Sequence, residues 1–209
     1  APHILLFPEI TFDPETFLAR VDACVREHDF CAIAVSEGLR GADGKLLAES
    51  GTRDAFGHAQ LGGVGQQVAE LIKGRLGHKY HWALPDYLQR SARHVASATD
   101  AAQAHALGRR AVELALEGRN AVMPGIVRTA DKPYAWDIGV AQLKDVANHE
   151  KMMPRDFISA DGFGITEACR NYLQPLIAGE DYPPYVDGLP AYVSLKNESV
   201  ARTLPPFAG

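Results

Sequence analysis

The sequence has 209 residues, a formal net charge of −5 and a pI of about 5.9. Its length suits one large domain or two small ones, and its 46% apolar and 22% charged residues exclude a collagen-like, low-complexity or strongly charged disordered chain. The mild acidity argues against a general nucleic-acid binder but is compatible with a small anionic substrate, because such a site needs only local positive charge.

Two predicted strands flank a helix in the first part of the chain. Apolar runs predict buried strands over residues 3–7 and 30–35. Between them, Asp13-Pro14-Glu15 predicts a helix start, because an Asp cap precedes a proline and an acid in the first turn. Residues 41–52 are polar and rich in glycine, which predicts a surface loop.

The rest of the chain continues to alternate between strand and helix patterns. A glycine-rich turn at residues 62–65 leads into an apolar helical stripe, and Thr99-Asp100 begins a long helix that ends near Gly118. We expect a last good helix over residues 165–177 and strands over residues 78–84, 121–127, 134–140 and 192–195. This alternation predicts an α/β protein with a mainly parallel sheet.

Polar side chains follow three of the predicted strands. In an open parallel sheet, ligands bind beyond the carboxyl ends of the strands. Pro8-Glu9, Ser36-Glu37-Gly38 and Pro85-Asp86-Tyr87 with Arg90 stand at such ends, so we expect these groups to converge. Residues 87–94 also hold two arginines, a histidine and a phenol, a pattern that suits either a phosphate or carboxylate site or an Arg-rich surface turn. Glu9 is likewise either an acceptor for sugar hydroxyls or a solvated acid at a strand end.

Several other chemistries are disfavoured. The glycine turn lacks the third glycine of G-x-G-x-x-G, so a plain helix entry is favoured over a dinucleotide site. Among the eight histidines, His78-x-x-His81 and His149-Glu150 have no further ligands at metal-binding spacing. The three cysteines, Cys24, Cys31 and Cys169, have no recognisable nucleophile context, and their odd number favours free thiols in a reducing, cytoplasmic compartment. No apolar run is long enough for a membrane helix, and no signal peptide is recognisable.

A set of short phrases occurs in a fixed order over about residues 3–180. They are Phe7-Pro8-Glu9, the strand at residues 31–38, Asp54-Ala55-Phe56-Gly57-His58-x-x-Leu61-Gly62-Gly63, Tyr87-Leu88-Gln89-Arg90-Ser91, Ala96-Ser97-x-x-Asp100 and Val146-Ala147-Asn148-x-Glu150-Lys151-x-x-Pro154. Each phrase alone is weak, but the ordered set is specific. On these residues the chain resembles the C-terminal half of a phosphofructokinase of the pyrophosphate-dependent type.

The resemblance implies a fold. Phosphofructokinases have two α/β domains with the active site in the cleft between them, so we expect a three-layer sandwich with a mainly parallel sheet. Residues 1–90 would form part of the fructose 6-phosphate-binding domain, residues 91–140 a segment that returns toward the donor-binding domain, and residues 141–209 the C-terminal helices and tail.

The resemblance also implies a glycolytic reaction and residue roles. The family transfers a phosphoryl group to the 1-hydroxyl of fructose 6-phosphate with Mg²⁺, here from pyrophosphate, and we expect a cytoplasmic homo-oligomer. Glu9 matches the acid that binds fructose hydroxyls, and Tyr87 and Arg90 match the residues that hold the sugar phosphate. His81 stands where the family usually has an Arg that reaches a neighbouring subunit, so it is the weaker candidate.

The family motifs for donor binding and catalysis do not occur in this sequence. We therefore expect the catalytic base and most Mg²⁺ ligands outside this chain, which would be a fragment without activity of its own; the opening on an apolar run without Met agrees. Three alternatives stay open at this level: an ATP-dependent phosphofructokinase, a non-catalytic sugar-phosphate-binding module and a structural oligomerisation half.

Overall fold

The computed structural model describes residues 2–47, 49–53, 59–61, 63–199, 201 and 203, with the backbone alone described at 49–53, 59–61, 89 and 90. The elements are β1 (Ile4–Leu6), α1 (Pro14–His28), β2 (Ile33–Val35), β3 (Glu49–Arg53), β4 (Ala59–Leu61), α2 (Val64–Leu76), α3 (Leu88–Ser91), α4 (Ala98–Leu116), β5 (Val122–Asp131), β6 (Tyr134–Gln142), α5 (Glu167–Leu173), β7 (Tyr185–Val186) and β8 (Leu189–Pro190). Four short 3-10 turns complete this part of the chain: η1 (Arg93–Val95), η2 (Leu143–Asp145), η3 (Arg155–Phe157) and η4 (Gln174–Ile177).

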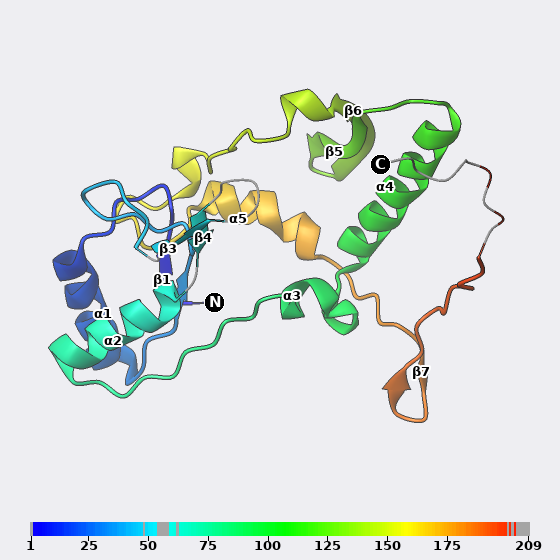
Figure 1. The fold of residues 1–209 in the computed structure, drawn as a ribbon. Helices are drawn as coiled ribbons and strands as arrows, with labels where there is room; N and C mark the ends of the chain where they lie inside the picture. The colour runs from blue at the N-terminus through cyan, green and yellow to red at the C-terminus, as the bar shows by residue number, and fades with distance from the viewer. Residues whose placement is uncertain are drawn as a thin grey trace.

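The core lies where α1 and α2 pack beside β1 (Figure 1). Helix α1 begins as predicted, because the Asp13 side chain accepts hydrogen bonds from the Glu15 and Thr16 backbone N–H groups. Its apolar stripe is buried against the strands and α2, and Phe17 and Ile4 have no exposed surface. The buried cluster is Ile4, Leu6, Phe12, Phe17, Leu18, Val21, Leu39, Val64, Val68 and Ile72.

The α/β class is confirmed. Among the described strands, β1 and β2 pair in parallel, with Ile4 opposite Ile33 and Leu6 opposite Val35. The other three pairs, β3–β4, β5–β6 and β7–β8, are antiparallel. The connections explain this difference, because α1 supplies the crossover that a parallel pair requires, whereas two-residue turns join β5 to β6 and β7 to β8.

Two predicted strands are wrong. Residues 78–84 and 192–195 have no regular secondary structure. The first segment looked like a buried strand because it alternates large apolar residues, but Tyr80, Trp82 and Leu84 are 37%, 47% and 56% exposed. The loop predicted at residues 41–52 is confirmed over its first part, and its last residues belong to β3.

A second group of elements lies at the other end of the molecule, where α4 packs beside the β5–β6 hairpin (Figure 1). Helix α4 is capped by Ser97 rather than by Thr99, because the Ser97 Oγ accepts a hydrogen bond from Asp100 N. The buried Gln103 donates a hydrogen bond of 2.6 Å to the Tyr134 hydroxyl, which fastens the helix to the hairpin. Within the described residues no helix is long and apolar enough to cross a membrane.

Candidate functional site

The carboxyl ends of β1 and β2 meet, as the parallel arrangement predicts. Ser36 N donates to Leu6 O at 3.1 Å, directly after the last paired residues. A Cβ added to Gly38 would lie 3.1 Å from the Pro8 Cβ, so glycine allows the two turns to approach closely. Two of the three predicted strand ends, Pro8-Glu9 and Ser36-Glu37-Gly38, are therefore neighbours.

Glu9 is half-buried in the turn after β1, and its two carboxylate oxygens differ. Oε1 accepts a hydrogen bond of 2.8 Å from the backbone N–H of Met153. Oε2 is buried and has no hydrogen-bond partner within the described part of the chain. A buried carboxylate oxygen without a partner is costly, so Oε2 is suited to accept a hydrogen bond from a bound hydroxyl.

A loop on the far edge of β1 supports this turn. Leu5 N donates to Phe163 O at 2.8 Å, so β1 is bonded on both sides. The loop is held by Asp161, whose Oδ1 accepts hydrogen bonds from Ser159 Oγ at 2.5 Å and Phe163 N at 3.1 Å. The Ser159 hydrogen bond, followed by the Phe163 backbone bond, lowers the pKa of Asp161 below its ordinary value.

The third predicted strand end behaves differently, since residues 78–84 form no strand. Tyr87 stands at the start of α3 and is 66% exposed, and its carbonyl accepts from Ser91 N at 3.0 Å. Arg90 belongs to α3 by its backbone, and its side chain lies outside the described residues. The meeting of Tyr87 and Arg90 with Glu9 stays a prediction.

His81 is exposed and belongs to the extended segment that leads from α2 to α3. This segment, with Trp82 and His78, lines a groove over Ile33 and Val35 of β2. The His78 Nε2 atom is buried there without a hydrogen-bond partner among the described residues. The glycine turn before α2 acts as a helix entry, with Gly63 in the left-handed region at φ 86°; its neighbour Gly62 lies outside the described residues.

Two of the three cysteines, Cys31 and Cys169, have a raised thiol pKa. Burial raises the pKa of the Cys31 thiol to about 12, and a hydrogen bond with the Cys24 thiol adds to this shift. Burial also raises the pKa of Cys169. Cys31 and Cys169 therefore stay protonated at neutral pH, and a thiol is a poor nucleophile.

Two features of the structure were not expected from sequence patterns. The contact of Met153 with Glu9 uses a backbone N–H, which every residue but proline carries, and only the phrase at residues 146–154 marked that segment. Cys24 and His28 have the i, i+4 spacing of one helix face, but His3 comes from the segment before β1, so local spacing could mark only two of the three residues.

Curated proteins similar to this chain are pyrophosphate–fructose 6-phosphate 1-phosphotransferases. The protein of Methylococcus capsulatus is 64% identical over 201 residues, which are 96% of this chain and 48% of the relative. The protein of Halomonas elongata is 59% identical over 206 residues, which are 99% of this chain and 49% of the relative. ATP-dependent 6-phosphofructokinases are more distant: that of Corynebacterium efficiens is 28% identical over 145 residues. No protein-family model matches the sequence.

Solved structures agree with the sequence comparison. A crystal structure of a pyrophosphate-dependent phosphofructokinase from Nitrosospira multiformis matches with a TM-score of 0.80 and 54% identity, over 99% of this chain and 48% of that one. A second, from Marinobacter aquaeolei, has a TM-score of 0.79 and 51% identity. The chain spans about half the length of the relatives it matches. The expected phosphofructokinase-like fold is thereby confirmed, and the chain belongs to the phosphofructokinase family, with its strongest similarity to pyrophosphate-dependent members.

Proposed function

We propose that this chain is the acceptor-binding half of an enzyme that transfers a phosphoryl group from pyrophosphate to fructose 6-phosphate and forms fructose 1,6-bisphosphate. The observation that carries the proposal is the 64% identity, over 96% of the chain, to a relative named for this reaction. The lower identity to ATP-dependent relatives, 28%, favours pyrophosphate as the donor.

Glu9 orients the sugar in this proposal. Its Oε1 is anchored by the Met153 N–H, and its Oε2 accepts a hydrogen bond from a fructose hydroxyl. A carboxylate that is already held in place loses little freedom when the sugar binds, and this preorganisation favours affinity. Tyr87 and Arg90 hold the 6-phosphate, since a guanidinium fits two phosphate oxygens and a phenol donates to a third. His81 is the weaker phosphate contact.

The chemical step depends mainly on the other half of the protein. Phosphoryl transfer is accelerated by positioning and by neutralising charge, and a base must remove the proton of the 1-hydroxyl. Mg²⁺ prefers oxygen ligands, and the one cluster of three possible ligands found among the described residues offers two imidazoles and a thiol. These residues do not fit Mg²⁺, and we assign most of its ligands to the other half, as the resemblance implies.

The proposed organisation follows from this division of labour. Residues 1–90 contribute to the fructose 6-phosphate-binding domain, residues 91–140 extend toward the donor-binding domain, and residues 141–209 form the C-terminal helices and tail. We further propose that the complete enzyme is a cytoplasmic homo-oligomer.

The test is an assay of the complete protein that carries this chain, with fructose 6-phosphate as acceptor and with pyrophosphate or ATP as donor. We expect fructose 1,6-bisphosphate to form with pyrophosphate and Mg²⁺ and to form much more slowly with ATP. Turnover with ATP alone would contradict the assigned donor. Binding of fructose 6-phosphate without turnover on either donor would instead indicate a non-catalytic sugar-phosphate module.

A further inference from the structure

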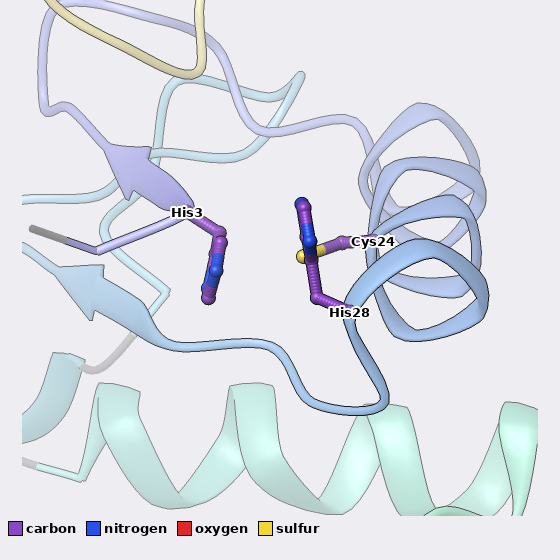
Figure 2. Close-up of side chains that lie close together, drawn as sticks. All are labelled: His3, Cys24 and His28. Atoms are coloured by element: carbon purple, nitrogen blue, oxygen red, sulfur yellow. The ribbon is translucent and has the colours of Figure 1, made fainter.

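Two imidazoles and a thiol meet at one end of α1, away from the turn that holds Glu9. Figure 2 shows His3 reaching across from the start of β1 toward Cys24 and His28 of α1. One ligand atom from each of the three side chains lies within 4.8 Å of the others. Cys24 is buried, His3 is half-buried and His28 is exposed, so the cluster has one solvent-facing side.

The backbone around this cluster is well supported. Cys24 and His28 are four residues apart on one helix, so both side chains project from the same face. His3 directly precedes Ile4, which is fully buried and pairs with Ile33 of β2. The same core therefore fixes the helix and the strand that carry the three side chains.

We propose that His3, Cys24 and His28 bind a thiophilic divalent cation such as Zn²⁺, with water completing the coordination. Imidazole nitrogen and thiolate sulfur are ligands that Zn²⁺ prefers and that Mg²⁺ does not. His28 lies in the last turn of α1, where the helix dipole favours positive charge. The cluster lies before β1 and at the end of α1, whereas Glu9 lies in the turn after β1.

Binding requires a local rearrangement. The rings of His3 and His28 are stacked, with centroids 5.0 Å apart and planes 22° apart, so their in-plane lone pairs do not yet converge. His3 Nδ1 accepts a hydrogen bond of 2.9 Å from Ala32 N. This hydrogen bond must break before Nδ1 can bind the cation or before the ring can turn.

The exposed His28 ring must turn away from His3 and from the Glu27 carboxylate, which lies 3.8 Å from its Nε2. The Cys24 Sγ must give up its hydrogen bond of 3.6 Å to the Phe30 carbonyl. The Cys24 thiol gives its proton to solvent as the sulfur coordinates, and no electron transfer is involved.

The site can be tested with Co²⁺ as the probe, in the complete protein prepared reduced and without a polyhistidine tag. Co²⁺ bound to a thiolate shows a charge-transfer absorption that imidazole or carboxylate ligands do not produce. We expect one Co²⁺ per chain with this absorption, displaced by Zn²⁺ and unaffected by excess Mg²⁺. Binding is expected to release a proton and to strengthen as the pH rises.

Two variants and two matched controls identify the ligands. Cys24→Ser is expected to abolish the absorption, and His28→Ala, at an exposed position, to weaken binding about tenfold or more. Cys169→Ser and His149→Ala change a buried thiol and an exposed imidazole elsewhere and are expected to leave binding unchanged. Absence of the absorption in the unaltered protein, its survival in Cys24→Ser, or unchanged affinity in His28→Ala would overturn the proposal.

Discussion

The Oε1 atom of Glu9 lies 2.8 Å from the backbone nitrogen of Met153, a residue 144 positions further along the chain. This hydrogen bond ties the carboxyl end of β1 to the segment that precedes η3. It also divides the carboxylate into one anchored oxygen and one, Oε2, that is buried without a partner among the described residues. Such a carboxylate is positioned before any ligand arrives.

The first prediction concerns this carboxylate. Glu9→Gln keeps one oxygen for the Met153 N–H and replaces the other with an amide donor, which cannot accept from a sugar hydroxyl. Loss of a hydrogen bond to a charged group is expected to raise the KM for fructose 6-phosphate about tenfold to hundredfold, with the unfolding midpoint nearly unchanged. Steady-state kinetics of the complete protein measure this. Glu150→Gln, an exposed change in the segment before Met153, is the control. An unaltered KM in Glu9→Gln would remove Glu9 from the substrate site.

A second prediction concerns the bond between α4 and the β5–β6 hairpin. Tyr134→Phe leaves the buried Gln103 amide without its acceptor and is expected to lower the free energy of unfolding by about 1–3 kcal/mol. The double variant Gln103→Leu/Tyr134→Phe removes both polar partners and should lose less than the sum of the single changes. Denaturant unfolding measures this coupling.

Tyr172→Phe is the matched control for this cycle. The rings of Tyr134 and Tyr172 both contact the Arg128 guanidinium, at 4.8 and 4.7 Å, and both substitutions keep that contact. We expect Tyr172→Phe to change stability by less than about 0.5 kcal/mol. Equal effects of the two substitutions would show that the Gln103 bond contributes nothing specific.

A third prediction separates backbone strain from steric overlap at two glycines. Gly179 and Gly188 both have positive φ, at 77° and 81°. A Cβ on Gly179 would lie 2.7 Å from the Ala98 Cβ, whereas a Cβ on Gly188 meets nothing within 4 Å. Gly188→Ala is expected to cost about 1–2 kcal/mol from the left-handed backbone alone. Gly179→Ala should cost about 1–3 kcal/mol more, because the start of α4 must shift. Thermal or denaturant unfolding of both variants tests the difference, and equal losses would argue against the close approach.

The fourth prediction is a pH dependence. Hydrogen bonds from Ser159 and Phe163 lower the pKa of Asp161 in the folded state. A lowered folded pKa stabilises the protein above the unfolded value of about 4, and this contribution is lost as the pH falls through the folded pKa. The difference in unfolding midpoint between the unaltered protein and Asp161→Asn should therefore be large near neutral pH and shrink in acid.

The control for this experiment is Asp187→Asn, which removes the same charge from an exposed turn between β7 and β8. It corrects for the general effect of surface charge on acid unfolding. A difference for Asp161→Asn that stays constant across the pH range would contradict the assigned role of the carboxylate.

Some of the fold and part of the site could be predicted from local patterns. The start of α1 was predictable because Asp13-Pro14 satisfies and preorganises the first turn whatever lies around it. The meeting of Pro8-Glu9 with Ser36-Glu37-Gly38 was predictable because parallel strands end at the same edge of a sheet. The strand at residues 78–84 failed because alternating apolar residues also suit an extended segment that lines a groove.

The sequence by itself determined the α/β class, the cap of α1, the presence of strands near residues 121–127 and 134–140, and the family, through phrases whose order is specific. That these two strands pair as an antiparallel hairpin was decided by the tertiary structure. Only the tertiary structure decided that Met153 meets Glu9, that Phe163 bonds the outer edge of β1, and that His3 faces Cys24 and His28. The physical reason is range. Caps and periodicity act within a few residues, whereas these contacts depend on packing that brings together segments distant in the chain. A backbone N–H or a single histidine also has no local sequence pattern that identifies its partner.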